Sequence, residues 1–110
     1  MIEVRFLKKN DKLKGFEIKG HAEYDDIGLD IVCAAVTSNA IAVINSLEEL
    51  VKVEFESVTA DAGIIECSVS DRYINDSQLL LKHLKLALNS ISEDYPENIK
   101  ILKAGGDSKC

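Results

Sequence analysis

Several residue types on which whole protein classes depend are scarce in this chain. Its 110 residues include no Trp, one Pro and three Cys, and aromatic residues make up 5% of the sequence. The cysteines, at positions 33, 67 and 110, are odd in number and lack metal-ligand spacing, which disfavours a zinc site and a disulfide framework. We therefore expect reduced thiols, no metal, no cofactor, and a core built mainly from Ile, Val, Leu and Ala.

Positive charge is also in short supply. A formal net charge of −6 at pH 7 disfavours nucleic acid as a direct partner, because phosphates are bound by clustered Lys and Arg, whereas a basic polypeptide would suit this surface. The N-terminus lacks the basic-then-apolar pattern of a signal peptide, so we expect a cytoplasmic protein. Residues 31–47 carry no charge, but their Thr, Ser and Asn favour a buried helix over a membrane span.

What is present is a clear alternation of strand-like and helix-like patterns. Apolar alternation predicts a hairpin from residues 2–6 and 16–20, and further strands over 52–56, 65–69 and 99–101. One helix is predicted from Asp30 as its N-cap to about residue 50, and a second from residues 75–77 to just before Pro96. The apolar stripe of the first helix comprises Val32, Val36, Ala40, Val43, Leu47 and Leu50.

This order predicts an α+β fold, a two-layer sandwich of order β-β-α-β-β-α-β with both helices on one face of a small sheet. We expect a single domain over residues 1–103 and a flexible C-terminal tail over residues 104–110. Ile41 and Ile44 lie off the stripe of the first helix, so that helix is apolar on more than one face. A homodimer contact would cover the second face.

His21 and Cys33 are the residues most suggestive of chemistry. His21 ends a strand-like run between the small residues Gly20 and Ala22, and Cys33 follows the predicted cap Asp30 at a helix start. A helix N-terminus and a nearby imidazole both favour a thiolate, and together they would form the nucleophile and base of a cysteine hydrolase. The alternatives are a small buried cysteine and a strand-end histidine bonded to backbone.

Neighbouring groups could support the same chemistry. Backbone N–H groups at the helix start, including those of Cys33 and Ala34, could stabilise an oxyanion, and Asp30 could orient His21, although capping is the simpler role for Asp30. The loop residues Glu23, Asp25 and Asp26 are most simply a solvated acidic loop, with attraction of a basic substrate as the functional alternative. Cys67 alternates with apolar strand residues and should be buried.

The segment Gly20-His21-Ala22, then Gly28, then Asp30-Ile31-Val32-Cys33-Ala34-Ala35 closely resembles the signature of the bacterial ribosomal-processing cysteine protease family, Prp. Length, element order and the late Tyr95-Pro96-Glu97-Asn98-Ile99 segment are similar as well, across residues 1–103. The resemblance implies a homodimeric endopeptidase with Cys33 as nucleophile and His21 as base. It also implies the substrate, the short N-terminal extension of the large-subunit ribosomal protein L-twenty-seven.

Two departures from the family pattern accompany the resemblance. Thr37 stands where many relatives are expected to have Ser, and the tail ending in Cys110 extends past the usual end. Two rival functions remain open on the residues alone. One is a non-catalytic ribosome-associated binding module in which Cys33 merely packs, and the other is a thiol redox enzyme, which would require a resolving cysteine near Cys33.

Overall fold

A computed structural model describes residues 1–20 and 27–103, with residues 27–30 described by their backbone alone. The predicted tail over residues 104–110 therefore lies outside the described residues. The predicted order of strands and helices is confirmed. The elements are β1 (Ile2–Lys9), β2 (Lys12–Lys19), α1 (Ile27–Ser46), a π-helical turn (Leu47–Val51), β3 (Phe55–Asp61), β4 (Ile64–Val69), a 3-10 turn (Asp71–Tyr73), α2 (Ile74–Asp94) and β5 (Ile99–Ile101).

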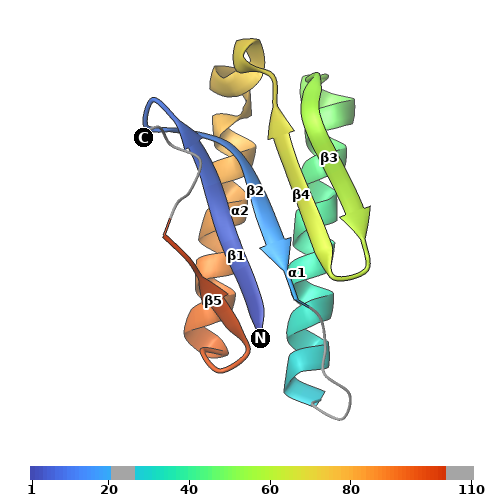
Figure 1. Cartoon of the computed structure of the whole chain (residues 1–110), viewed down its shortest axis with the longest axis vertical. Helices are drawn as coiled ribbons and strands as arrows, with labels where there is room; N and C mark the ends of the chain where they lie inside the picture. The colour runs from blue at the N-terminus through green and yellow to red at the C-terminus, as the bar shows by residue number, and fades with distance from the viewer. Residues whose placement is uncertain (21–26, 104–110) are drawn as a thin grey trace.

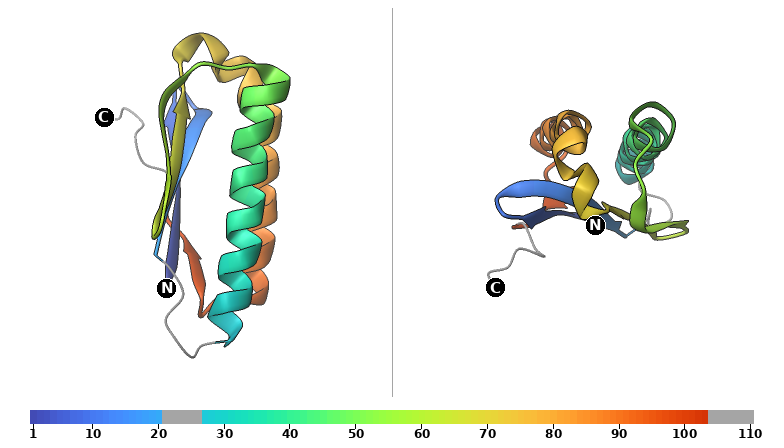
Figure 2. Two further views of the ribbon diagram at one scale, coloured as in Figure 1. Left: turned by 90° about the vertical axis from the view of Figure 1, so that its right-hand side faces the viewer. Right: turned by 90° about the horizontal axis from the view of Figure 1, so that it is seen from above.

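The five strands form one mixed sheet in the order β3-β4-β2-β1-β5 (Figure 1). β1 pairs antiparallel with β2 and parallel with β5, and β4 pairs antiparallel with both β2 and β3. Both helices lie side by side on one face of this sheet (Figure 2), which confirms the predicted two-layer α+β sandwich. Because β3 and β5 are the edge strands, each has one side without a partner strand among the described residues.

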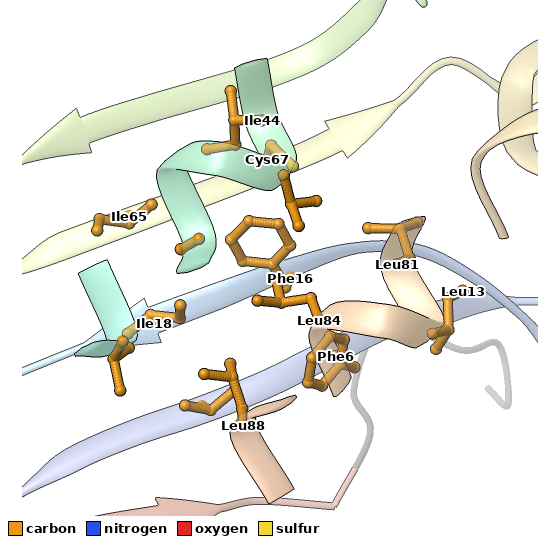
Figure 3. Packing of buried hydrophobic residues seen from close by; sticks show 14 of the residues in the cluster. Phe6, Leu13, Phe16, Ile18, Ile44, Ile65, Cys67, Leu81, Leu84 and Leu88 are labelled. Atoms are coloured by element: carbon orange, nitrogen blue, oxygen red, sulfur yellow. The ribbon is translucent and has the colours of Figure 1, made fainter. Parts of the chain in front are cut away.

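The core fills the space between the sheet and the two helices (Figure 3). Among the described residues, Phe6 of β1 and Phe16 of β2 contribute the only buried aromatic rings, with centroids 6.3 Å apart and planes tilted by 51°. Aliphatic side chains supply nearly all the rest, as the composition predicted. The largest fully buried side chains besides the two Phe are Ile2, Leu47, Leu81, Leu84, Leu88, Ile99, Val4, Val32, Val36 and Val69.

The start of α1 differs from the sequence prediction. The helix begins at Ile27, so Asp30 lies inside it and the prediction that Asp30 is its N-cap is wrong. An acidic residue is favourable both as a cap and within the first turn, where it meets the positive end of the helix dipole, so its presence did not fix the helix start. Cys33 is consequently in the second turn of α1 rather than the first.

The end of the first helix also differs. The helical backbone changes to a π-helical turn over Leu47–Val51, and Lys52 then adopts a left-handed conformation with φ of 64° and ψ of 46°. This change in winding turns Leu50 out to solvent, where 76% of it is exposed, so its predicted place on the buried stripe is wrong. The strand predicted over residues 52–56 begins later for the same reason, at Phe55.

Residues Ile31–Val51 are long and apolar enough to cross a membrane by length and composition alone. In the fold, however, Val32, Val36, Ala40 and Val43 of this segment are buried in the core. Ile44 is buried as well, at 6% exposed, so one of the two residues that suggested a second apolar face is covered within the single chain. The segment is thus a core helix with one outer face.

Candidate active site

Cys33 lies at the wall of a pocket of ≈ 280 Å³ between α1 and the adjoining end of the sheet. The thiol-bearing residue is half-buried, and it packs partly against the hydrophobic core. Three separate parts of the chain complete the wall, which is mostly apolar. They are Ile2, Ile18 and Gly20 from β1 and the end of β2, Val36 and Thr37 from α1, and residues 61–65, which run from the end of β3 through the turn into β4.

Gly20 places the chain that leads to His21 beside Cys33. Gly20 lines the same pocket as Cys33, and its backbone N–H donates a hydrogen bond of 3.1 Å to the carbonyl oxygen of Gly63. Its φ of 106° is a conformation that L side chains rarely adopt, and an added Cβ would lie 2.4 Å from the carbonyl oxygen of Met1. Only glycine fits this position without distortion.

Several predicted site residues lie outside the described residues. These are His21, and the loop carboxylates Glu23, Asp25 and Asp26. For Asp30 the backbone alone is described, and Ala34 is an exposed residue of α1. The structure thus brings the residue before His21 to the pocket of Cys33.

The helix bounds remove the basis for the predicted oxyanion site. An α-helix leaves only its first four N–H groups without intrahelical partners, and in α1 those belong to residues 27–30. The N–H groups of Cys33 and Ala34 lie deeper in the helix, so the prediction that they are available at a helix start is wrong. The helix dipole, which acts mainly within the first turn, also has less influence on Cys33 than the sequence suggested.

Two contributions to the pocket were missed by sequence reasoning. The first is the end of β3 with the turn that follows, where Asp61, Ala62 and Gly63 form a wall although they are 28 or more positions from Cys33 in the sequence. No local pattern indicates that contact, because it depends on strand order. The second is Thr37, whose position one helical turn after Cys33 on the same face could have been found from helical spacing.

The second described cysteine has a different environment. Cys67 of β4 is fully buried, as predicted, and lies beneath α1 near Ile44 (Figure 3). Burial raises the pKa of the Cys67 thiol to about 12, with a smaller contribution from the negative charge of Glu66. Such a thiol is protonated at neutral pH and inaccessible, so it is unsuited to nucleophilic chemistry.

A second, polar cavity of ≈ 310 Å³ lies near the turn between β1 and β2, against Lys9, Lys12, Asp71 and Asn75. Asp71 is paired there with Lys9 and, at 2.6 Å, with Lys14. Hydrogen bonds from Lys14 and Lys9 lower the pKa of the Asp71 carboxyl to about 2. Lys12 donates a hydrogen bond of 2.6 Å to the side-chain oxygen of Asn75. These bonds join β1 and β2 to the segment at the start of α2, so the cluster is a structural network.

Comparison with known proteins places this geometry in a family. The family model described as "Cysteine protease Prp" matches residues 1–100, a range that includes His21, Cys33 and every residue lining the pocket. The chain belongs to the Prp cysteine protease family. It is therefore a cysteine-type peptidase, a hydrolase. The resemblance inferred from the sequence motif is confirmed.

The relatives of this Prp family member are similar over most of their length. The ribosomal processing cysteine protease Prp of Bacillus subtilis is 28% identical over 109 residues, covering 92% of this chain and 96% of the relative. The protein of the same name from Staphylococcus aureus is 30% identical over 84 residues, covering 74% of this chain and 78% of the relative.

Solved structures share the fold closely. A crystal structure from Streptococcus mutans has a TM-score of 0.82 and 27% identity, covering 94% of this chain and 97% of that chain. The essential ribosomal processing protease Prp from S. aureus in complex with a substrate peptide also has a TM-score of 0.82 and 27% identity, covering 94% and 99%. A further S. aureus Prp structure holds a covalently linked product peptide, with a TM-score of 0.79 and 26% identity over 94% of this chain and 99% of that chain.

Proposed function

We propose that this chain cleaves the N-terminal extension of the bacterial ribosomal protein L-twenty-seven, with Cys33 as nucleophile and His21 as general base. The observation that carries the proposal is the contrast between the two described cysteines. Cys33 lines a pocket and is half-buried, whereas Cys67 is sealed in the core with its pKa raised to about 12. Cys33 is thus the described thiol that a substrate can reach.

The proposed chemistry is acyl transfer in two steps. His21 takes the proton of the Cys33 thiol, and the sulfur attacks the scissile carbonyl carbon to give a tetrahedral intermediate. The C–N bond then breaks, the leaving amine takes a proton from His21, and a thioester to Cys33 remains. Water, deprotonated by His21, attacks the thioester and releases the carboxylic acid product and the thiol.

Support for the pairing of these residues comes from Gly20. Its hydrogen bond to Gly63 and its position in the pocket bring the residue before His21 to the same cavity as Cys33. The covalently linked product peptide in the S. aureus relative supports a covalent mechanism for the family fold. With Cys33 in the second helical turn, the imidazole has the larger part in activating the thiol.

The proposed partner is a basic polypeptide segment, and the physical support is charge. A net charge of −6 attracts a basic chain and repels phosphate, so we propose a ribosomal protein tail rather than nucleic acid as the partner. The names of the relatives, which describe ribosomal processing, support the same substrate class. A cytoplasmic location, in which such a substrate is made, completes this proposal.

The two rival functions are less well supported. A binding module that uses Cys33 only for packing does not explain why this residue lines a pocket, nor the match to a protease family. A redox function needs a partner thiol, and Cys67 is buried under α1 with a raised pKa.

We also propose a homodimer. Because Ile44 is buried within the single chain, the surface that supports the dimer is the outer face of α1. Residues 31–47 carry no charge, and on the side away from the sheet Ile31 is 53% exposed. Ala34, Ser38 and Ala42 continue that exposed, uncharged stripe at helical spacing. A second copy packed on this stripe would cover it by two-fold symmetry.

The test is cleavage of a peptide that spans the N-terminal extension of L-twenty-seven, followed by mass spectrometry. We expect two products from the wild type and none from Cys33→Ala, which should keep its circular dichroism spectrum because the change removes one sulfur. Cys67→Ala is the matched control, and its folded fraction should cleave the peptide. Cleavage by Cys33→Ala, or an intact peptide with folded wild type, would reject the proposed function.

A further inference from the structure

β3 (Phe55–Asp61) is an edge strand whose outer side is open. Among the described residues it pairs with β4 alone, and Figure 1 shows it at the rim of the sheet beside α1. Edge strands are commonly protected by Lys, Pro, a β-bulge or a covering element, because their unpaired N–H and C=O groups accept a further strand. β3 contains neither Lys nor Pro, and most of its residues are exposed. Its register shift lies between Phe55 and Ser57, at the end away from the pocket.

The side of β3 that faces the helix layer is apolar and uncovered. Val58 pairs with Cys67 and Ala60 pairs with Ile65, and these partners point into the core. Val58 and Ala60 are nevertheless accessible, Val58 at 49%, so the helix layer leaves this face of the strand largely accessible. An additional strand on the outer side of β3 would find apolar side chains on that face.

The strand leads directly to the proposed nucleophile. Asp61, the last residue of β3, lines the same pocket as Cys33. Figure 1 shows that the strand runs toward the end of the molecule where α1 begins. A chain lying along β3 would thus have one end at the pocket.

The charged residues in and around β3 are all acidic. Residues 53–69 contain Glu54, Glu56, Asp61 and Glu66 and no basic residue. Glu56 pairs with Lys14 at 3.1 Å, and Glu66 accepts a hydrogen bond from Ser57. For Glu54 and Asp61, in contrast, no ion pair occurs within the part of the chain that the structure describes, and both are exposed.

We propose that the substrate is bound as an extended strand added to the outer edge of β3, with Asp61 holding a basic side chain near the scissile bond. Main-chain hydrogen bonds to β3 supply affinity, and Asp61, with Glu54 at the far end, selects a basic segment. The partner is therefore an extended, basic polypeptide. This inference rests on the proposed function for the reaction, but it assigns a separate surface, which can be tested separately.

The charge component is tested with Asp61→Asn and two peptides, the L-twenty-seven extension peptide with its following basic residues and a version with every Lys and Arg replaced by Gln. For the basic peptide we expect Asp61→Asn to raise KM roughly two- to five-fold, the size of one exposed ion pair, with kcat changed less than about two-fold. The Gln version should show no difference between the enzymes. Asp94→Asn, the same change at the exposed end of α2, is the control and should leave both KM values unaltered.

The location is tested by photo-cross-linking to Cys33→Ala, which we expect to bind the peptide without turnover. A peptide with a photoreactive residue several positions from the scissile bond should label residues 55–61. Labelling of β5, the other edge strand, would overturn the inference. So would a KM for Asp61→Asn that rises equally for both peptides, or that does not rise for the basic peptide. Because binding is read without cleavage, failure of the protease proposal would show as no turnover by wild type, whereas failure of the docking proposal would leave turnover intact.

Discussion

The backbone N–H of Gly20 donates a hydrogen bond of 3.1 Å to the carbonyl oxygen of Gly63. This bond ties the end of β2 to the turn between β3 and β4, two segments that wall the pocket of Cys33. The chain leaves this point directly into residue 21. A single backbone contact thus connects the residue that precedes the proposed base in the sequence to the turn that lines the pocket of the proposed nucleophile.

Gly20→Ala should damage both fold and activity. The φ of 106° is strained for Ala, and the new Cβ would meet the Met1 carbonyl oxygen at 2.4 Å, so the end of β2 must shift. We predict a loss of about 1–3 kcal/mol in the free energy of unfolding, measured by urea denaturation, and a lower kcat/KM. Lys19→Ala, an exposed change next to it, is the control. An unchanged denaturation midpoint for Gly20→Ala would contradict the close approach.

Lys52→Gly should stabilise the protein. Lys52 has a φ of 64°, and its side chain contributes only a 3.3 Å hydrogen bond to the Glu49 carbonyl oxygen at an exposed site. Glycine adopts this conformation without the steric cost, so we predict a gain of about 0.5–1 kcal/mol, measured by thermal unfolding. Lys82→Gly on the exposed side of α2 should instead lose about 1 kcal/mol. A destabilised Lys52→Gly would show that the lysine conformation is not strained.

Asp71 should make stability sensitive to acid. Its folded-state pKa of about 2 lies below the ordinary value of 3.8, because Lys14 and Lys9 donate to the carboxylate. A depressed carboxyl pKa stabilises the fold above pH 3.8, and this contribution disappears as pH falls toward 2. Asp71→Asn should therefore be less stable than wild type at pH 6, and the difference should shrink as the pH falls through about 2, in low salt. A difference that persists unchanged at pH 2 would assign the effect to something other than charge.

The proposed dimer is tested on the outer face of α1. We expect wild type to sediment at twice its 12.1 kDa chain mass. Ala42→Glu places a charge on the exposed uncharged stripe and should raise the dissociation constant at least about ten-fold, because the charge would be buried in the interface. Ser90→Glu on exposed α2 is the control. A monomeric wild type at micromolar concentration would reject the dimer.

The fold was largely predictable because its signals are local. Alternation located β1 and β2, and Asn10 and Asp11 accept the positive φ values of 54° and 67° that a tight hairpin turn requires. The predicted helix ends were wrong where one residue pattern is compatible with two backbone conformations. Asp30 fits a cap or a first turn, and nothing in residues 47–52 marks the change to a π-helical turn.

The site was only partly predictable for a different reason. The sequence singles out Cys33 by its place near a predicted helix start, twelve residues after His21, whereas Cys67 alternates with core residues. The contribution of Asp61 and Gly63 to the pocket depends on the pairing of β4 with β2, and no local sequence pattern indicates which strands pair. The environment of Cys33 therefore required the structure.

The central claim is that Cys33 attacks the substrate, and the most direct measurement is rapid-quench mass spectrometry of the acyl-enzyme. Wild type is mixed with the L-twenty-seven extension peptide, quenched in acid at early times, digested and analysed for a mass increase equal to the N-terminal product less one water. We predict this increase on the proteolytic fragment that contains Cys33. In His21→Ala at raised pH the acyl-enzyme should accumulate to a higher level, because the thiolate forms but hydrolysis of the thioester lacks its base. Product formation with the adduct on Cys67 or Cys110, or with no adduct at any quench time in either enzyme, would contradict the account.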